Sequence, residues 1–145
     1  MTDQKKAAVE AVENKEELIR KTADQIWNYA ELSLREEQSA DYYCRILEEE
    51  GFQVERGISG IKTAFSASFG SGSPRIGILA EYDALSGLSQ KAGSTKQEEI
   101  TPGGCGHGCG HNLLGAGSFG AALGLKAHPG KTGHPGPAIL YGCPG

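Results

Sequence analysis

The sequence has no long apolar run and comparatively few basic residues. No apolar segment approaches the roughly 18 residues of a membrane span, so no transmembrane helix is expected. Lys and Arg number 14 against 18 Asp and Glu, and the net charge of −4 argues against a nucleic-acid partner. The charged N-terminal stretch also lacks the apolar core of a signal peptide. We therefore expect a cytoplasmic protein that acts on small molecules, without nucleic-acid or membrane partners.

Cysteine is also scarce, and the four thiols are Cys44, Cys105, Cys109 and Cys143. In a reducing compartment, such thiols favour metal binding or simple burial over disulfide formation. Cys44 falls in the apolar stripe of an amphipathic segment, so we expect it to be a buried structural thiol. With 145 residues, the chain is long enough for one compact core.

The first third of the chain has helical periodicity. Apolar residues three or four positions apart predict one long amphipathic helix from about Lys5 to Ala30. The same spacing predicts a shorter helix from Glu37 to Glu50, which Gly51 would end as a C-terminal cap. Two N-terminal helices are therefore expected.

The pattern then changes to short strands. "FQVERG" and "TAFSASFG" alternate as strands do. "RIGILAEY" is a nearly continuous apolar run, typical of a central strand buried on both faces of a parallel sheet. A helix over Asn112–Ala127 and a strand at "AILYG" would complete a βαβ unit. The glycines inside that helix suggest close approach to a neighbouring element.

The segment "CGHGCGH", Cys105 to His111, places four potential metal ligands in seven residues. In an extended chain, residues two apart are separated by roughly 6.6 Å, too far for all four to surround one ion. We expect two of them to bind, one thiolate and one imidazole, with other ligands from elsewhere. That donor set suits zinc, and an incomplete shell is typical of a catalytic site. The alternative is a flexible loop with incidental thiols.

Two acids, Glu81 and Asp83, follow the apolar strand in "ILAEYDAL". Loops after the carboxyl ends of parallel strands converge on one edge of the sheet. The acids, the "CGHGCGH" segment and "YGCPG" could therefore share one cavity. The alternative for the acids is a solvated turn.

Four segments in this order, "ILAEYDAL", "PGG", "GHGCGHNLLGAGSFGAALGLK" and "ILYGCP", resemble motifs of the M20 metallopeptidase family. The resemblance is to its amidohydrolase branch, which includes aminobenzoyl-glutamate hydrolases and acyl-amino-acid or dipeptide hydrolases. It implies an α/β fold, the N-terminal part of a zinc-peptidase-like (phosphorylase/hydrolase-like) catalytic domain. In this fold, two N-terminal helices precede a mixed sheet with a βαβ unit.

The resemblance also implies a function. It implies hydrolysis of an amide bond in an N-acyl amino acid, aminobenzoyl-glutamate or a dipeptide, with a divalent metal, zinc or else manganese. Cys109 and His111 match the metal ligands of this branch. His107 matches a histidine that supports the ligands or orients the substrate. Asp83, in the catalytic acidic motif, supports the metal shell together with Glu81, whereas Cys105 matches nothing in the motifs.

The resemblance breaks off after "YGCP". Relatives continue with alanine and two glutamates, a general base and a metal ligand, whereas here Gly145 follows Pro144. We expect residues 1–145 to be a partial catalytic domain that lacks the dimerisation (lid) domain and the C-terminal half, with a homodimeric parent enzyme. The isolated chain is then expected to be inactive. The alternative is a non-catalytic, metal-binding truncated paralogue.

Overall fold

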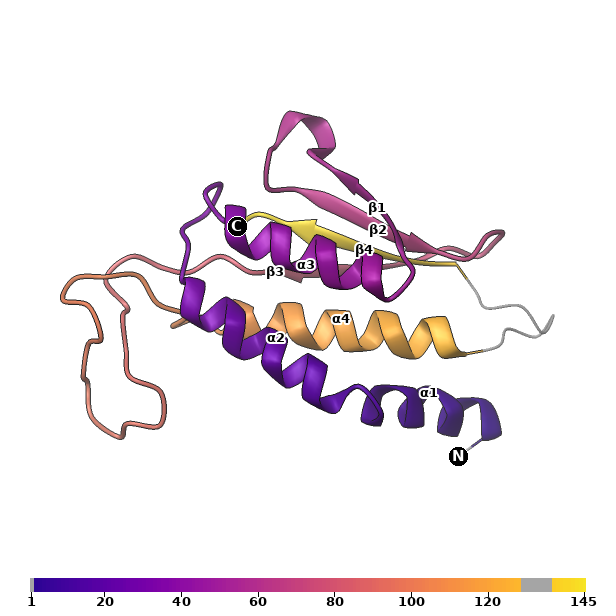
Figure 1. The fold of residues 1–145 in the computed structure, drawn as a ribbon, viewed down its shortest axis with the longest axis horizontal. Helices are drawn as coiled ribbons and strands as arrows, with labels where there is room; N and C mark the ends of the chain where they lie inside the picture. Colours follow the sequence, from indigo (N-terminus) through magenta and orange to yellow (C-terminus); the bar gives the residue numbers. More distant parts are fainter. Residues whose placement is uncertain (1, 129–136) are drawn as a thin grey trace.

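The computed structural model describes residues 2–128 and 137–145, in which helices pack against a mixed sheet (Figure 1). The helices are α1 (Asp3–Glu13), α2 (Glu16–Tyr29), α3 (Glu37–Glu49) and α4 (His111–Ala127), with a 3₁₀ turn at Ile58–Gly60. The strands are β1 (Gln53–Arg56), β2 (Phe65–Phe69), β3 (Ile76–Glu81) and β4 (Ala138–Cys143). The α/β class predicted from the sequence is confirmed.

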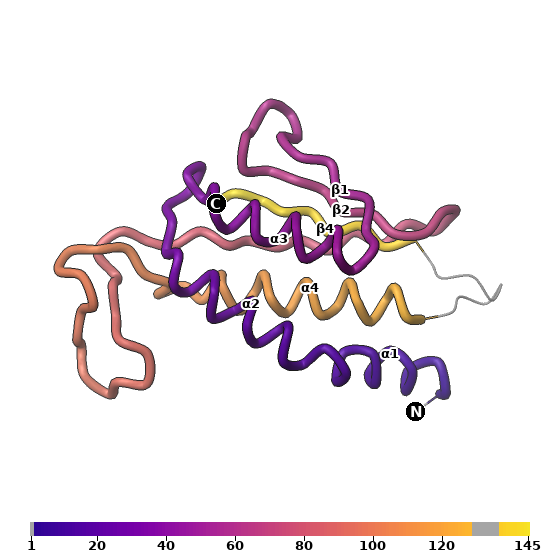
Figure 2. The backbone as a smooth tube through the Cα atoms, viewed as in Figure 1, coloured from indigo at the N-terminus to yellow at the C-terminus, as the bar shows by residue number. Residues whose placement is uncertain are grey.

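The sheet has the order β1-β2-β4-β3. The β1–β2 and β2–β4 pairs are antiparallel, and β3 pairs with β4 in parallel. Helix α4 lies between β3 and β4 in the chain and packs against both strands, so the predicted βαβ unit is confirmed. The long connection over residues 86–110 extends beyond the body formed by the sheet and helices (Figure 2).

The prediction of one long helix from Lys5 to Ala30 is wrong. The helix breaks at Asn14 and Lys15, because the backbone of Lys15 (φ −111°, ψ 10°) leaves helical geometry. The Lys15 ammonium lies 2.5 Å from the Glu50 carboxylate at the end of α3, which anchors the break. Both α1 and α2 pack along α4, with a bend between them (Figure 1). The bend keeps both apolar faces on α4, which periodicity within one segment does not reveal.

Within residues 2–128 and 137–145, the prediction that "RIGILAEY" is a central strand is also wrong, because β3 lies at an edge of the sheet and β4 is central. Ile76 and Leu79 are 47% and 64% exposed. On the face opposite Leu79, Ala80 is buried and Ile78 is half-buried, as the period-two geometry of a strand requires, while Ile76 on that same face is exposed at the start of the strand. Only one face of β3 is therefore covered in the part of the chain that the structure describes.

The predicted helix over Glu37–Glu50 is confirmed as α3, and Gly51 follows it with φ +80°, a conformation that glycine adopts without strain. Cys44 is 1% exposed on the buried face of α3, and burial raises the pKa of its thiol to about 11. Beside it, Tyr43 packs on Phe65 and Tyr82, with ring centroids 6.2 and 5.6 Å away. Cys44 is thus the buried structural thiol that the sequence predicts.

The glycines of α4 mark close contacts at three of four positions. A Cβ at Gly115 would lie 2.5 Å from the Tyr43 hydroxyl oxygen, one at Gly120 3.0 Å from Ile19, and one at Gly124 3.1 Å from Val12. Gly117 faces open space. Small residues therefore let α1, α2, α3 and β3 approach α4 closely.

No helix in the described ranges is long and apolar enough to cross a membrane.

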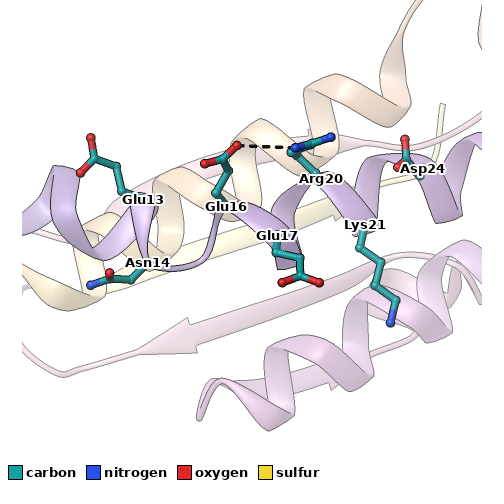
Figure 3. A pocket seen from close by; sticks show the side chains of 7 residues that line it. All are labelled: Glu13, Asn14, Glu16, Glu17, Arg20, Lys21 and Asp24. Atoms are coloured by element: carbon teal, nitrogen blue, oxygen red, sulfur yellow. Dashed lines mark ion pairs between the residues drawn. The ribbon is translucent and has the colours of Figure 1, made fainter.

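A surface hollow of about 650 Å³ lies over the break between α1 and α2 (Figure 3). An ion pair between Glu16 and Arg20 crosses part of it. The side chains around it are Glu13, Asn14, Glu16, Glu17, Arg20, Lys21 and Asp24. This charged lining has neither histidine nor cysteine, so the chemistry that the sequence predicts must lie elsewhere.

Candidate active site

The carboxyl end of β3 and the first turn of α4 bring three ionisable side chains together. Glu81 ends β3, Asp83 follows two residues later, and His111 is the first residue of α4. The Nδ1 atom of His111 lies 2.5 Å from Oδ1 of Asp83, and its Nε2 atom lies 3.1 Å from Oε2 of Glu81. The imidazole is thus held between two carboxylates.

The two carboxylates differ in solvent exposure. The Asp83 side chain is 7% exposed, the His111 side chain 19% and the Glu81 side chain 41%. A buried carboxylate that accepts a hydrogen bond from Nδ1–H fixes both the tautomer and the orientation of an imidazole. This arrangement directs Nε2 of His111 toward Glu81 and the more open side of the cluster.

The glycines of the "CGHGCGH" segment are required by its packing. Gly106 pairs with Leu85 through two backbone hydrogen bonds, and a Cβ at Gly106 would lie 1.9 Å from the Leu88 carbonyl oxygen. A Cβ at Gly108 would lie 2.4 Å from the Leu88 side chain. Gly110 has φ +83° at the start of α4, which turns the chain into the helix. The absence of side chains at Gly106 and Gly108 thus allows the segment to pack closely against residues 85–89.

Among the described residues, neither cysteine of this segment joins the His111 cluster in a set of metal ligands. Cys109 is exposed and Cys105 is half-buried. Within residues 2–128 and 137–145, no group of three or more His, Cys, Asp and Glu side chains is arranged to hold a metal ion. The structure thus joins His111 to the two acids but does not add Cys109 to form a complete ligand set.

His107 is buried against α2. It is 5% exposed, its Nε2 atom lies 2.9 Å from the Ile26 carbonyl oxygen, and its ring stacks on Trp27 with centroids 6.2 Å apart. Burial lowers the pKa of His107. These contacts anchor the "CGHGCGH" segment to α2.

Two further residues next to the site have no role assigned by the sequence analysis. Asn112 donates a hydrogen bond of 3.2 Å to the carbonyl oxygen of Ala23 in α2, so it flanks His111 with a second anchor. The sequence feature that could have identified Asn112 is a polar amide at the start of an otherwise apolar helix. Cys143 is paired with Glu81 in the β3–β4 register, and burial followed by the Glu81 charge raises the pKa of its thiol. Its signal is its place at the end of a strand parallel to β3.

Stability should fall as the pH falls below neutrality, because protonating His107 opposes folding. In the unfolded chain, histidine has a pKa of about 6.5, so the unfolded state gains a proton before the folded state does. The stability from neutral His107 is therefore present above about pH 6.5 and lost as the pH falls toward its lower folded-state pKa. Urea unfolding of the metal-free protein between pH 5 and 8 should show this slope. The slope should shrink in His107→Gln and persist in the His128→Gln control; an unchanged slope in His107→Gln would contradict the assignment.

No protein-family model matches the chain. The chain is 46% identical over 136 residues to a p-aminobenzoyl-glutamate hydrolase subunit of Escherichia coli K12, covering 94% of this chain and 28% of the relative. It is 29% identical to Xaa-Arg dipeptidase of Mus musculus, covering 97% of this chain and 31% of that protein. A dinuclear metal-binding peptidase of the M20 family from Bacillus subtilis superposes with a TM-score of 0.67 at 22% identity, covering 87% of this chain and 34% of that structure.

The chain therefore spans less than a third of the length of these two sequence relatives. The aligned region includes nearly all of this sequence, and the solved structure shares its fold. The resemblance that the motifs predict is thus confirmed: the chain is a homologue of a p-aminobenzoyl-glutamate hydrolase subunit and has the fold of an M20-family peptidase.

Proposed function

We propose that this sequence forms part of a metal-dependent amidohydrolase that cleaves the amide bond of an N-acyl amino acid, aminobenzoyl-glutamate or a dipeptide. The observation that carries the proposal is the His111 imidazole, fixed by buried Asp83 and facing Glu81 at the carboxyl end of β3. The identity to a p-aminobenzoyl-glutamate hydrolase and the similarity to a dipeptidase support this substrate class.

We propose that this site binds a divalent metal, zinc first and manganese as the alternative, with only part of the ligand set among the described residues. Because Nδ1 of His111 is engaged by Asp83, Nε2 is the ring nitrogen proposed as the metal ligand, and imidazole ligates metals in its neutral form. Cys109 would supply an exposed thiolate, and thiolate with imidazole favours zinc over calcium or magnesium. We propose Cys109 and His111 as ligands, with Glu81 beside them. A divalent ion bound there would polarise the amide carbonyl and lower the pKa of water.

The side chains of this region have separate tasks in the proposed reaction. Asp83 holds the proton on Nδ1 of His111 and keeps the ring oriented. Glu81 is exposed enough to contact substrate or solvent and places negative charge next to Nε2. His107 and Asn112 attach the backbone on either side of Cys109 to α2, so they hold the segment that carries the proposed thiolate ligand and His111.

The wider setting is proposed on the same basis. We propose that residues 1–145 form one part of a catalytic domain, since they match about a third of the M20 peptidase structure. We further propose a homodimeric assembly and a cytoplasmic location. Size-exclusion chromatography with light scattering and cell fractionation check these two points.

Hydrolysis assays on the full-length protein that contains residues 1–145 test the function. The protein is stripped of metal by a chelator and assayed with aminobenzoyl-glutamate, N-acyl amino acids and dipeptides, before and after addition of zinc or manganese. We expect no turnover without metal and recovery with it. Turnover that survives complete metal removal, or no turnover of any of these amides with metal present, would contradict the proposal.

A further inference from the structure

A buried carboxylate lies in the connection between α2 and α3 and takes no part in the cluster around His111. Glu36 is 0% exposed. Its Oε1 atom accepts a hydrogen bond of 3.3 Å from the backbone N–H of Gly145, and Oε2 has no hydrogen-bond partner among the described residues. Burying a carboxylate is costly unless its contacts compensate, so its place here calls for a specific role.

The connection that carries Glu36 contacts both strands that end at the site. The Glu31 carbonyl accepts a hydrogen bond of 2.7 Å from the N–H of Ala84, the residue after Asp83. The Ser33 hydroxyl donates to the carbonyl of Gly145, whose N–H is bound to Glu36. The connection is thus hydrogen-bonded to the backbone after β3 and to the backbone after β4. Figure 1 shows the end of β4 beside the first turn of α3.

Gly145 in turn lies directly against the site. A Cβ at this position would be 2.2 Å from Cγ of Asp83 and 2.3 to 2.5 Å from its carboxylate oxygens. The backbone of Gly145 therefore packs on the buried carboxylate that binds Nδ1 of His111. A continuous series of contacts runs from Glu36 through Gly145 and Asp83 to the imidazole.

We propose that Glu36 is a positioning residue for the amidohydrolase reaction: it holds the backbone of Gly145 against Asp83, so that Asp83 keeps His111 in its working orientation. The inference rests on the proposed function. Glu36 touches neither His111 nor Glu81 and acts only through Gly145. Loss of such an indirect support typically lowers activity about 10- to 100-fold.

Three variants of the full-length protein test the proposal. Glu36→Leu removes the acceptor for the Gly145 N–H, and Glu36→Gln retains a side-chain oxygen in its place. Glu37→Leu is the matched control, because the neighbouring Glu37 is exposed and pairs with Lys62 at 2.7 Å. The readouts are kcat and KM for amide hydrolysis, and amide hydrogen exchange measured by mass spectrometry in a peptide covering residues 138–145.

We expect Glu36→Leu to lower kcat about 10-fold or more, to leave KM nearly unchanged and to speed exchange at Gly145. Glu36→Gln should restore most of both properties, and Glu37→Leu should change neither. If Glu36→Leu does not fold, Ser33→Ala removes the second hydrogen bond to Gly145 from an exposed side chain and should also speed exchange there.

Unchanged kcat in folded Glu36→Leu, or unchanged exchange at Gly145 in both Glu36→Leu and Ser33→Ala, would overturn the positioning role. A wild-type protein that hydrolyses none of the amides would overturn the proposed function instead. Exchange at Gly145 would then still decide whether Glu36 holds this backbone.

Discussion

Replacing His111 by Ala is expected to abolish amide hydrolysis and to weaken zinc binding by more than about 100-fold. Loss of an outer support for a ligand costs about 10- to 100-fold, and loss of the ligand itself should cost more. The expectation follows from Nε2 of His111, which buried Asp83 orients toward Glu81. Competitive titration of the metal-free protein with zinc and a chromophoric chelator measures the affinity directly, without depending on activity.

The cysteines of the same segment supply the controls for this titration. Cys109→Ser should also lose zinc affinity, since Cys109 is the proposed thiolate ligand. Cys105→Ser should retain it, because Cys105 is half-buried and has no assigned role. Equal loss in all three variants would indicate an independent structural site built from the whole "CGHGCGH" segment. Zinc binding without hydrolysis in the full-length protein would favour the non-catalytic alternative.

Local sequence patterns predicted which helices and strands form better than they predicted how these elements are arranged beside one another. Helical spacing and a glycine cap correctly predicted α3, and the apolar runs correctly predicted β3, β4 and the βαβ unit. The break at Lys15 was missed because it depends on α4 and on Glu50, which are distant in sequence. The edge position of β3 was missed because an apolar run does not specify how many partners a strand has.

The candidate site shows the same division. The rule that loops meet at the carboxyl ends of parallel strands anticipated a shared edge, and the structure places Glu81, Asp83 and His111 there. The anchoring contacts of His107 and Asn112 lie on backbone carbonyls of α2, and no sequence spacing encodes such partners. Glu36 gave no signal because a glutamate in a polar, charged stretch is ordinarily exposed.

Replacing Gly115 by Ala is expected to destabilise the protein by about 1–3 kcal/mol, as overpacking of a filled core does. The new methyl group would lie 2.5 Å from the Tyr43 hydroxyl oxygen and 2.7 Å from the Glu81 carbonyl oxygen. Tyr43 cannot withdraw easily, because it is fully buried and packs on Phe65 and Tyr82. Relief must therefore come from movement of α4 away from β3, which would also shift Glu81 relative to His111.

Gly117 provides the matched control on the same helix. It is exposed and a Cβ there meets nothing within 4 Å, so Gly117→Ala should stabilise the protein by up to about 1 kcal/mol through helix propensity alone. Urea unfolding of the two variants therefore separates propensity from packing, because the chemical change is identical. Gly115→Ala should also bind zinc more weakly than Gly117→Ala. Equal stabilisation by both substitutions would show that α4 is not tightly packed against β3 at Gly115. The claim that this contact keeps Glu81 in place beside His111 would then be contradicted.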